Sequence, residues 1–290
     1  KGYAFNPAGY VNPVKDPENP ELAQAGLLSA NFEYIKSFSS PLLQSLAVQL
    51  VVMPSPPLYS GRYEEAEKTD VALKSYFLLM DTDIDLMGYY SQAGPRRIGF
   101  DFARNLKENL ALHGEWSYNH HAQRYTIAAG VPLAQQANPY SYLLGLRYLH
   151  ISNTTFIVEY YHNGSGMKGS EFAGYLDFLE AGAASDNSAI VRQTLEQSQN
   201  NFRSSTLMRD YLYLKFSMPE PFDWLYFTPS LYTLYNLSDR SFLLSTPISY
   251  KPVTNVEFIF WPAFLFGDPD SEFGHKQLQQ RLEVWMRAFF

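Results

Sequence analysis

Apolar and polar residues alternate along much of the chain with a period of two. The final segment is the clearest case, with Leu282, Val284 and Met286 on one side and Arg281 and Glu283 on the other. A β-strand turns successive side chains to opposite faces, so this spacing predicts a strand with one apolar face and one charged face. Similar alternation recurs over residues 84–90, 97–102, 110–118, 144–148, 155–161 and 209–216.

The lengths of these segments favour strands that cross a membrane. Each runs for about 9–12 residues, as a tilted strand needs to span a bilayer, whereas ordinary strands average about 5–6. Aromatic residues gather at the segment ends, for example at Tyr89, Tyr90, Tyr160 and Tyr161. Long and short connections also mostly alternate, as in outer-membrane barrels. The alternative is a soluble antiparallel sandwich with its apolar face inward.

The pattern over residues 26–290 therefore predicts a transmembrane antiparallel up-and-down β-barrel with about thirteen strands. Pro229, Pro247 and Pro262 fall inside predicted strands, so we expect them near strand ends or bulges, where a missing ladder donor is tolerated. If the final strand runs toward the periplasm, counting back over thirteen strands places residues 1–25 outside the cell. These residues are therefore predicted to be an extracellular loop segment. An odd count also predicts that at least one strand precedes Lys1, which would make this the C-terminal part of a larger barrel.

The longest connection, residues 163–205, is predicted to be partly helical. Phe172, Tyr175, Leu176 and Leu179 recur at helical spacing. A second helix is predicted over residues 188–199, with Asp186 or Asn187 as its cap. This extracellular or pore-folded loop would constrict the pore, cap the barrel or hold a partner, and the alternative is a surface lid without a role in transport.

The composition excludes several classes of protein. Hydrophobic residues make up 46% and aromatic residues 16% of the chain, which argues against disorder. The absence of cysteine excludes disulfides and thiolate metal sites. The net charge of -7 lacks the basic footprint of a nucleic-acid binder. No cofactor and no nucleic-acid partner are therefore expected.

The ending RLEVWMRAFF resembles the C-terminal signal of Gram-negative outer-membrane β-barrels, and the chain is similar in style to porin-like and polysaccharide-exporter-like barrels. The resemblance implies a location in the bacterial outer membrane, contact with its lipids and recognition by the barrel-assembly machinery. The positions that match the signal are Leu282, Val284, Met286, Ala288 and Phe290.

Two groups of acidic residues are candidate cation sites. The run Asp81, Asp83, Asp85 lacks the glycine and the bidentate acid of a calcium-binding loop, because Leu86 and Gln92 stand at those positions. An ordinary polar wall is favoured there over a row that attracts cations. The cluster Asp268, Asp270 and Glu272 is a surface cation site or, as we favour, a solvated loop.

Residue types used in catalysis and metal binding give only weak signals. His162 and Ser165 resemble the neighbourhood of outer-membrane phospholipases, where a serine and a histidine must lie within hydrogen-bond reach. The adjacent His120 and His121 are a weak metal signal without further ligands. No enzymatic activity and no metal site are predicted.

The charged residues on the polar face of the strands are predicted to line the lumen. Their signs are mixed, so opposite charges are expected to pair across strands, and a strongly ion-selective pore is not expected. They are Asp83, Asp85, Arg97, Asp101, Glu115, Arg147, Glu159, Arg209, Lys215, Arg281, Glu283 and Arg287.

The sequence therefore predicts a channel or porin-like barrel for passive passage or export of solutes. The alternative is a structural barrel that scaffolds or sheathes a partner protein, such as an electron carrier, in its lumen or at the surface. A remote alternative is an outer-membrane lipid hydrolase.

Overall fold

The computed structural model describes residues 1–12, 14–18, 28–54, 68–92, 94–128, 131–202, 206–276 and 278–289. These residues form two compact units. The first contains Lys1–Gly145 and Tyr161–Ser165, and the second contains Leu146–Tyr160 and Gly166–Phe290. Each unit is mostly antiparallel β-sheet.

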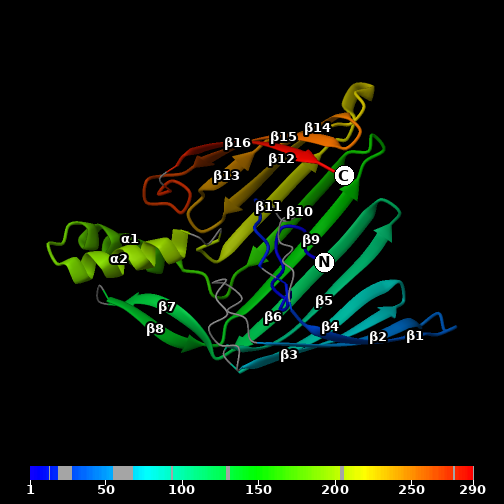
Figure 1. Ribbon diagram of the computed structural model, residues 1–290, viewed down its shortest axis with the longest axis horizontal. Helices are drawn as coiled ribbons and strands as arrows, with labels where there is room; N and C mark the ends of the chain where they lie inside the picture. Colours follow the sequence, from blue (N-terminus) through cyan, green and yellow to red (C-terminus); the bar gives the residue numbers. More distant parts are fainter. Residues whose placement is uncertain are drawn as a thin grey trace. The chain divides into compact units, whose positions relative to one another are not determined.

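In the first unit consecutive strands are neighbours in the sheet, in the order β1-β2-β3-β4-β5-β6-β9 (Figure 1). Every register resolved between β1 and β6 is antiparallel. The strands are β1 (Ala30–Ser37), β2 (Leu43–Pro54), β3 (Thr69–Leu79), β4 (Thr82–Ser91), β5 (Arg96–Lys107), β6 (Leu110–His120) and β9 (Tyr140–Leu149). The structure thus has the up-and-down arrangement that the alternation predicts.

The second unit continues the same pattern in the order β10-β11-β12-β13-β15-β14, with β16 paired to β15. β9 and β10 each contribute residues to both units. The strands are β10 (Thr155–His162), β11 (Asp210–Ser217), β12 (Phe227–Asn236), β13 (Phe242–Ser245), β14 (Ile248–Val253), β15 (Val256–Phe266) and β16 (Gln280–Ala288). The two units contain 14 strands of antiparallel sheet, so the predicted fold class is confirmed at this level.

One predicted strand is interrupted in the structure. β13 and β14 both lie between β12 and β15, on either side of Thr246 and Pro247. The 14 strands therefore fill thirteen positions across the sheet, the number predicted. Pro262 lies in the interior of β15 and not near its end, but its carbonyl accepts from Thr246 N at 3.3 Å, so it faces the interruption. On the β16 side Pro262 is paired with Leu282. Its missing N–H is tolerated because its other side faces the interruption between β13 and β14.

The exposure of the two strand faces is the reverse of that in a soluble sandwich. Val284 is 71% exposed and Met286 is 68% exposed, whereas Asp85 and Glu115 are only 2% and 4% exposed. The alternation holds within single strands: in β9, Leu144 and Leu146 are exposed while Leu143 is buried. Exposed large apolar side chains lie on most strands of both units, among them Leu73, Leu86, Ile98, Phe100, Leu144, Phe156, Val158, Leu214, Leu231, Phe258, Phe260 and Leu282.

The connection over residues 119–139 is predicted as a loop, but the structure shows a two-stranded antiparallel sheet. β7 (Ala122–Ala128) pairs with β8 (Val131–Ala137) from Ala122↔Ala137 to Ala128↔Val131. The sequence there lacks the sustained apolar alternation of the other strands, so the period-two pattern does not predict this hairpin.

The insertion at residues 163–205 contains two packed helices, α1 (Gly169–Ala183) and α2 (Ser188–Phe202) (Figure 1). α1 buries Phe172, Tyr175 and Leu176, three of the four residues that predict it, whereas Leu179 is half-buried. Before α2, the Asn187 side chain accepts from Ala189 N at 2.9 Å, as expected of a capping residue. In the described part of the chain, neither helix has both the length and the hydropathy to cross a membrane.

Candidate functional site

Three carboxylates lie next to one another on the polar face of the first unit. The strand registers pair Asp85 of β4 with Asp101 of β5, and Asp101 with Glu115 of β6. All three residues are buried. Like charges directly opposite each other destabilise a sheet, so this carboxylate row requires a source of positive charge. The expected pairing of opposite charges on neighbouring strands is therefore wrong at Asp101 and Glu115 and holds at Asp85, whose Oδ2 lies 3.1 Å from Lys74 Nζ of β3.

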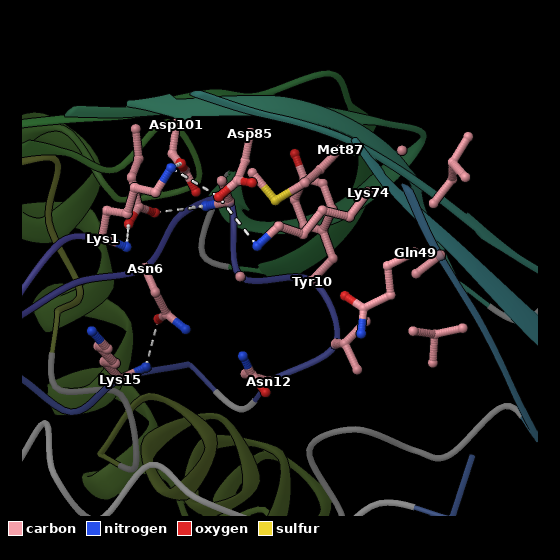
Figure 2. Close-up of a pocket in the computed structure, with 18 residues that line it drawn as sticks. Lys1, Asn6, Tyr10, Asn12, Lys15, Gln49, Lys74, Asp85, Met87 and Asp101 are labelled. Atoms are coloured by element: carbon pink, nitrogen blue, oxygen red, sulfur yellow. Dashed lines mark hydrogen bonds and ion pairs between the residues drawn. The ribbon is translucent and has the colours of Figure 1, made fainter. Parts of the chain in front are cut away.

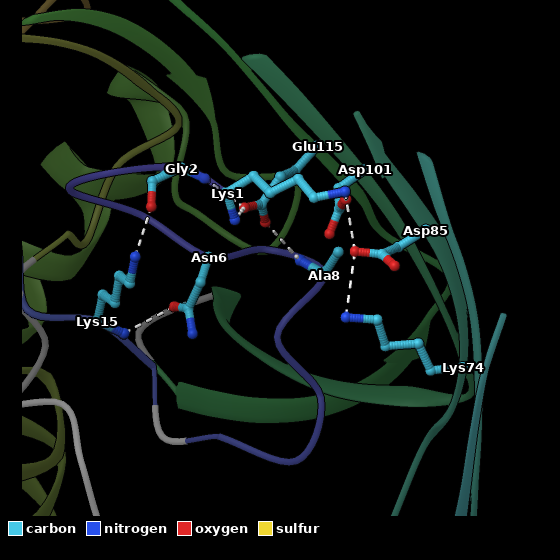
Figure 3. Close-up of polar contacts among 9 residues, drawn as sticks. All are labelled: Lys1, Gly2, Asn6, Ala8, Lys15, Lys74, Asp85, Asp101 and Glu115. Carbon is cyan, nitrogen blue, oxygen red and sulfur yellow. Dashed lines mark hydrogen bonds and ion pairs between the residues drawn. The ribbon is translucent and has the colours of Figure 1, made fainter. Parts of the chain in front are cut away.

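Lys1 supplies that charge. Its Nζ lies 2.9 Å from Asp85 Oδ2 and 2.6 Å from Asp101 Oδ1 (Figure 3). Lys74 of β3 adds a second cation, with Nζ 3.1 Å from Asp85 Oδ2. Burial lowers the pKa of Lys1, but hydrogen bonds and charge from Asp101 and Asp85 outweigh it, so the net shift is upward and the ammonium form is favoured.

Glu115 is held by the main chain of the N-terminal segment, which we define as residues 1–18. The backbone nitrogens of Lys1 and Gly2 donate to Glu115 Oε1 at 2.8 and 2.6 Å. The backbone nitrogen of Ala8 donates to Oε2 at 3.3 Å. Glu115 therefore fixes the segment to β6 through three N–H donors.

Tyr10 forms a second contact between the N-terminal segment and β6. Its side chain is buried and its hydroxyl donates to Ser117 Oγ of β6 at 3.1 Å. The ring lies beside Tyr89 and under the guanidinium of Arg97, whose Cζ is 5.9 Å from the ring centroid. Burial raises the pKa of the Tyr10 hydroxyl to about 12, so it remains a neutral donor at any physiological pH.

The N-terminal segment is folded and not an extended loop end. Lys15 N donates to Asn6 Oδ1 at 2.7 Å, and Lys15 Nζ donates to the Gly2 carbonyl at 2.5 Å (Figure 3). Ala4 and Phe5 are buried as well. The sequence predicts residues 1–25 as an extracellular loop segment and gives no sign of this packing. Residues 13 and 19–25 lie outside the described residues.

A cavity of about 860 Å³ lies between the N-terminal segment and the wall formed by β2 to β6 (Figure 2). The carboxylate row lines it together with three lysines, so the charged side chains of the lining are balanced in number. The polar residues around it are Lys1, Asn6, Tyr10, Asn12, Lys15, Gln49, Lys74, Asp85, Asp101 and Glu115.

A second polar cluster lies in the second unit, between the β15–β16 connection and residues before β11. Glu272, almost fully buried, accepts from Leu207 N at 2.6 Å, from the Tyr211 hydroxyl at 2.8 Å and from Asn236 Nδ2 at 2.7 Å. Its own N–H donates to Asp239 Oδ2 at 2.7 Å. Burial raises the pKa of the Glu272 carboxyl to about 7, against the opposing hydrogen bond from Leu207. The expected solvated loop is therefore wrong for Glu272.

The other predicted lumen residues share the polar parity but form separate contacts. Asp83 accepts from the Tyr76 hydroxyl at 2.5 Å, and Arg209 Nε donates to the Gly166 carbonyl at 3.0 Å. Glu159 is fully buried, and Lys215 is half-buried. Arg147, in contrast, is exposed.

Near the C-terminus the expected cross-strand pairing is present. Glu257 lies directly opposite Arg287, with 3.6 Å between its Oε2 and the guanidinium. Arg281 Nε lies 2.9 Å from Glu283 Oε1 on the same strand. The apolar positions of the assembly signal, Leu282, Val284 and Met286, are exposed, as is Ala288. Phe290 lies outside the described residues.

The residues considered for metal binding and hydrolysis make other contacts. The rings of His120 and His121 stack with 3.8 Å between their centroids, and the ring of His162 stacks on that of Tyr142 with 5.0 Å between centroids. The Ser165 carbonyl accepts from Arg124 Nε at 3.3 Å. Among the described residues no group of three or more histidine or acidic side chains is placed to hold a metal ion.

Sequence reasoning missed Lys1, Tyr10, Lys74 and Glu257. Lys74 is next to the exposed Leu73 in β3, and Glu257 is next to the exposed Phe258 in β15. Because successive residues of a strand face opposite sides, the alternation in β3 and β15 would have placed both charged residues on the polar face. Lys1 and Tyr10 belong to a segment without periodicity, and no local signal predicts where they dock.

No family model matches the chain, and no curated protein matches it. Among solved structures, a mutant of the ferric enterobactin receptor PfeA from Pseudomonas aeruginosa is 12% identical over 82% of this chain, with a TM-score of 0.35. The copper transporter OprC is 12% identical over 84% of this chain, with a TM-score of 0.34. This chain spans 40% and 47% of those two chains.

Proposed function

We propose that this chain forms the wall of an outer-membrane β-barrel in a Gram-negative bacterium and allows solutes to pass along its polar face. The observation that carries the proposal is the reversed exposure of the strands. Val284 and Met286 are more than two-thirds exposed, whereas Asp85 and Asp101 are buried.

The exposed apolar face is costly in water and suited to lipid. Covering one large apolar side chain is worth about 1.5–3 kcal/mol, and such residues lie on most of the strands. A soluble sandwich would bury this face against a second sheet and would leave the carboxylates in water. Lipid acyl chains cover the apolar face without a second sheet, and the polar face then borders the lumen.

Passive passage of small solutes is the function that a polar lumen supports best. The cavity beside the carboxylate row holds three lysines and three carboxylates, and such a balance favours a path with little preference for either ion sign. No step of this proposal requires catalysis, a metal or a cofactor. We include outer-membrane lipids and the barrel-assembly machinery as partners, the latter through the residues of the C-terminal signal.

A second candidate is a barrel that holds protein in place of free solute. It is favoured by the N-terminal segment, which already covers part of the polar face in the first unit through Lys1, Ala8 and Tyr10. In this case the lumen sheathes a polypeptide, its own or that of a partner.

Conductance in a planar lipid bilayer distinguishes the two candidates. The full chain, purified in detergent and reconstituted, should give discrete conductance steps in KCl if solutes pass. An electrically silent protein that is nonetheless inserted in the bilayer would refute the channel and favour the occupied barrel. A monodisperse, detergent-free monomer in buffer would contradict the membrane assignment itself.

A further inference from the structure

The carboxylate row depends on one residue for most of its charge compensation. Asp85, Asp101 and Glu115 follow one another across three adjacent strands. Lys1 Nζ contacts two of them, at 2.9 and 2.6 Å, and Lys74 contacts only Asp85. Without the Lys1 ammonium, Asp101 would lose its basic partner among the described residues and would face a carboxylate on each side.

The position of Lys1 is determined by the fold of the N-terminal segment. Glu115 binds the backbone nitrogens of Lys1 and Gly2, and Lys15 closes the segment on itself through the Gly2 carbonyl. Tyr10 fixes the far side of the segment to Ser117. These contacts place the Lys1 ammonium over the carboxylate row, and its own ion pairs with Asp85 and Asp101 add to the hold on the segment.

Lys1 and the three carboxylates of the row border open space. Lys1, Asp85, Asp101 and Glu115 all line the cavity of about 860 Å³ (Figure 2). A solute in this cavity experiences the field of the row directly, because the groups lie at its wall. With Lys1 present the lining has three lysines against three carboxylates, and without it two lysines remain.

We propose that Lys1 is the selectivity-determining residue of this path, because its ammonium cancels the carboxylate row and secures the N-terminal segment over it. The inference rests on the proposed channel function. A ring or row of carboxylates selects cations when nothing compensates it. Removing the Lys1 charge should therefore convert a path of balanced charge into one that favours small cations.

The test is the reversal potential of single channels under a KCl gradient, measured for the full chain. Lys1→Gln should raise the permeability of K⁺ relative to Cl⁻ several-fold, most strongly at low salt, where charges are least screened. Lys1→Arg, which keeps the charge, should retain the wild-type ratio. Lys107→Gln, the same chemical change at an exposed position of β5 outside the cavity, should also leave it unchanged.

Adding Asp85→Asn and Asp101→Asn to Lys1→Gln should restore the wild-type ratio, because the uncompensated charge is then removed. A purely structural role for Lys1 would change channel number or stability without this restoration, and that result would overturn the inference on selectivity. If Lys1→Gln conducts with the wild-type ratio, the inference is overturned while the channel function stands.

A second readout separates the inference from the channel function. Cleavage after Lys15 by a lysine-specific protease reports whether the segment is held, whether or not the protein conducts. Lys1→Gln should be cleaved there several-fold faster than wild type and Lys107→Gln. If neither wild type nor Lys1→Gln conducts, faster cleavage supports Lys1 as the residue that holds the segment in an occupied barrel, and equal cleavage overturns that as well.

Discussion

Tyr10 of the N-terminal segment lies directly over Gly99 of β5. A Cβ at position 99 would overlap the Tyr10 hydroxyl and would lie 2.6 Å from the Trp116 carbonyl oxygen. Only glycine therefore leaves room for the ring that donates to Ser117. The wall strand and the segment that covers it are matched in shape at this point, in addition to the charge match at Lys1.

Gly99→Ala should displace Tyr10 and loosen the N-terminal segment. Overpacking of this kind typically costs about 1–3 kcal/mol. The matched control is Gly88→Ala on β4, where an added Cβ meets nothing within 4 Å. Urea titration in detergent should show a lower midpoint for Gly99→Ala and little change for Gly88→Ala. Equal midpoints would show that Tyr10 is not packed as described.

Neighbouring residues of β9 should respond differently to changes in charge. Leu146 lies on the apolar face, 43% exposed, and Leu146→Arg would place a cation toward lipid at a cost of about 2–4 kcal/mol near the bilayer midplane. Arg147→Leu changes the polar face and should insert and fold nearly normally. Folded yield in lipid vesicles, followed by gel mobility with and without heating, measures the difference. Equal tolerance at the two positions would place the faces of β9 the wrong way round.

Alternation predicted the strands well because it reports burial directly. Leu144 and Leu146 reveal the lipid-facing side of β9 from sequence alone, and the same holds for Val284 in β16. Alternation does not report strand interruptions: β13 and β14 separate at Thr246 and Pro247, and the signal for this boundary in the sequence is the proline, which has no N–H for the ladder.

The site was predicted only in part, for a related reason. The parity of a residue gives its face, but only the register shows which residues of that face become neighbours. Asp85, Asp101 and Glu115 were each placed on the polar face, yet nothing in the sequence aligns them into one row. Lys1 binds the row through long-range docking of a segment without periodicity, which no local pattern encodes.

Phe290 is predicted to take part in barrel assembly. This prediction rests only on the resemblance of the C-terminal sequence to the outer-membrane signal. Deleting it, or replacing it with Asp, should reduce insertion in cells, because the apolar row of the last strand then lacks its interfacial aromatic residue. Arg287→Gln, on the polar parity of the same strand, is the control. The amount of heat-modifiable protein in outer-membrane fractions is the measurement. Unchanged insertion of both Phe290 variants would remove this residue from the assembly signal.

Glu272 should make the stability of the second unit depend on pH. Burial raises the pKa of its carboxyl from 4.5 to about 7, so the folded chain keeps a proton that the unfolded chain has lost. The folded state is therefore most favoured below pH 4.5, and the free energy of unfolding should fall by about 3 kcal/mol as the pH rises to 7. Above that pH both states are ionised, and this contribution becomes constant.

Glu272→Gln isolates this effect, because a neutral amide cannot lose a proton while it can still accept hydrogen bonds from Leu207 and Tyr211. Its unfolding free energy should change less between pH 5 and pH 8 than that of wild type. Asp270→Asn, an exposed change in the same connection, should keep the wild-type dependence and so accounts for a change of charge alone. Urea titrations in detergent at the two pH values measure both. The buried-carboxyl explanation fails if wild type and Glu272→Gln lose the same stability, since Asp239, Lys276 and the remaining titratable groups would then account for the whole dependence.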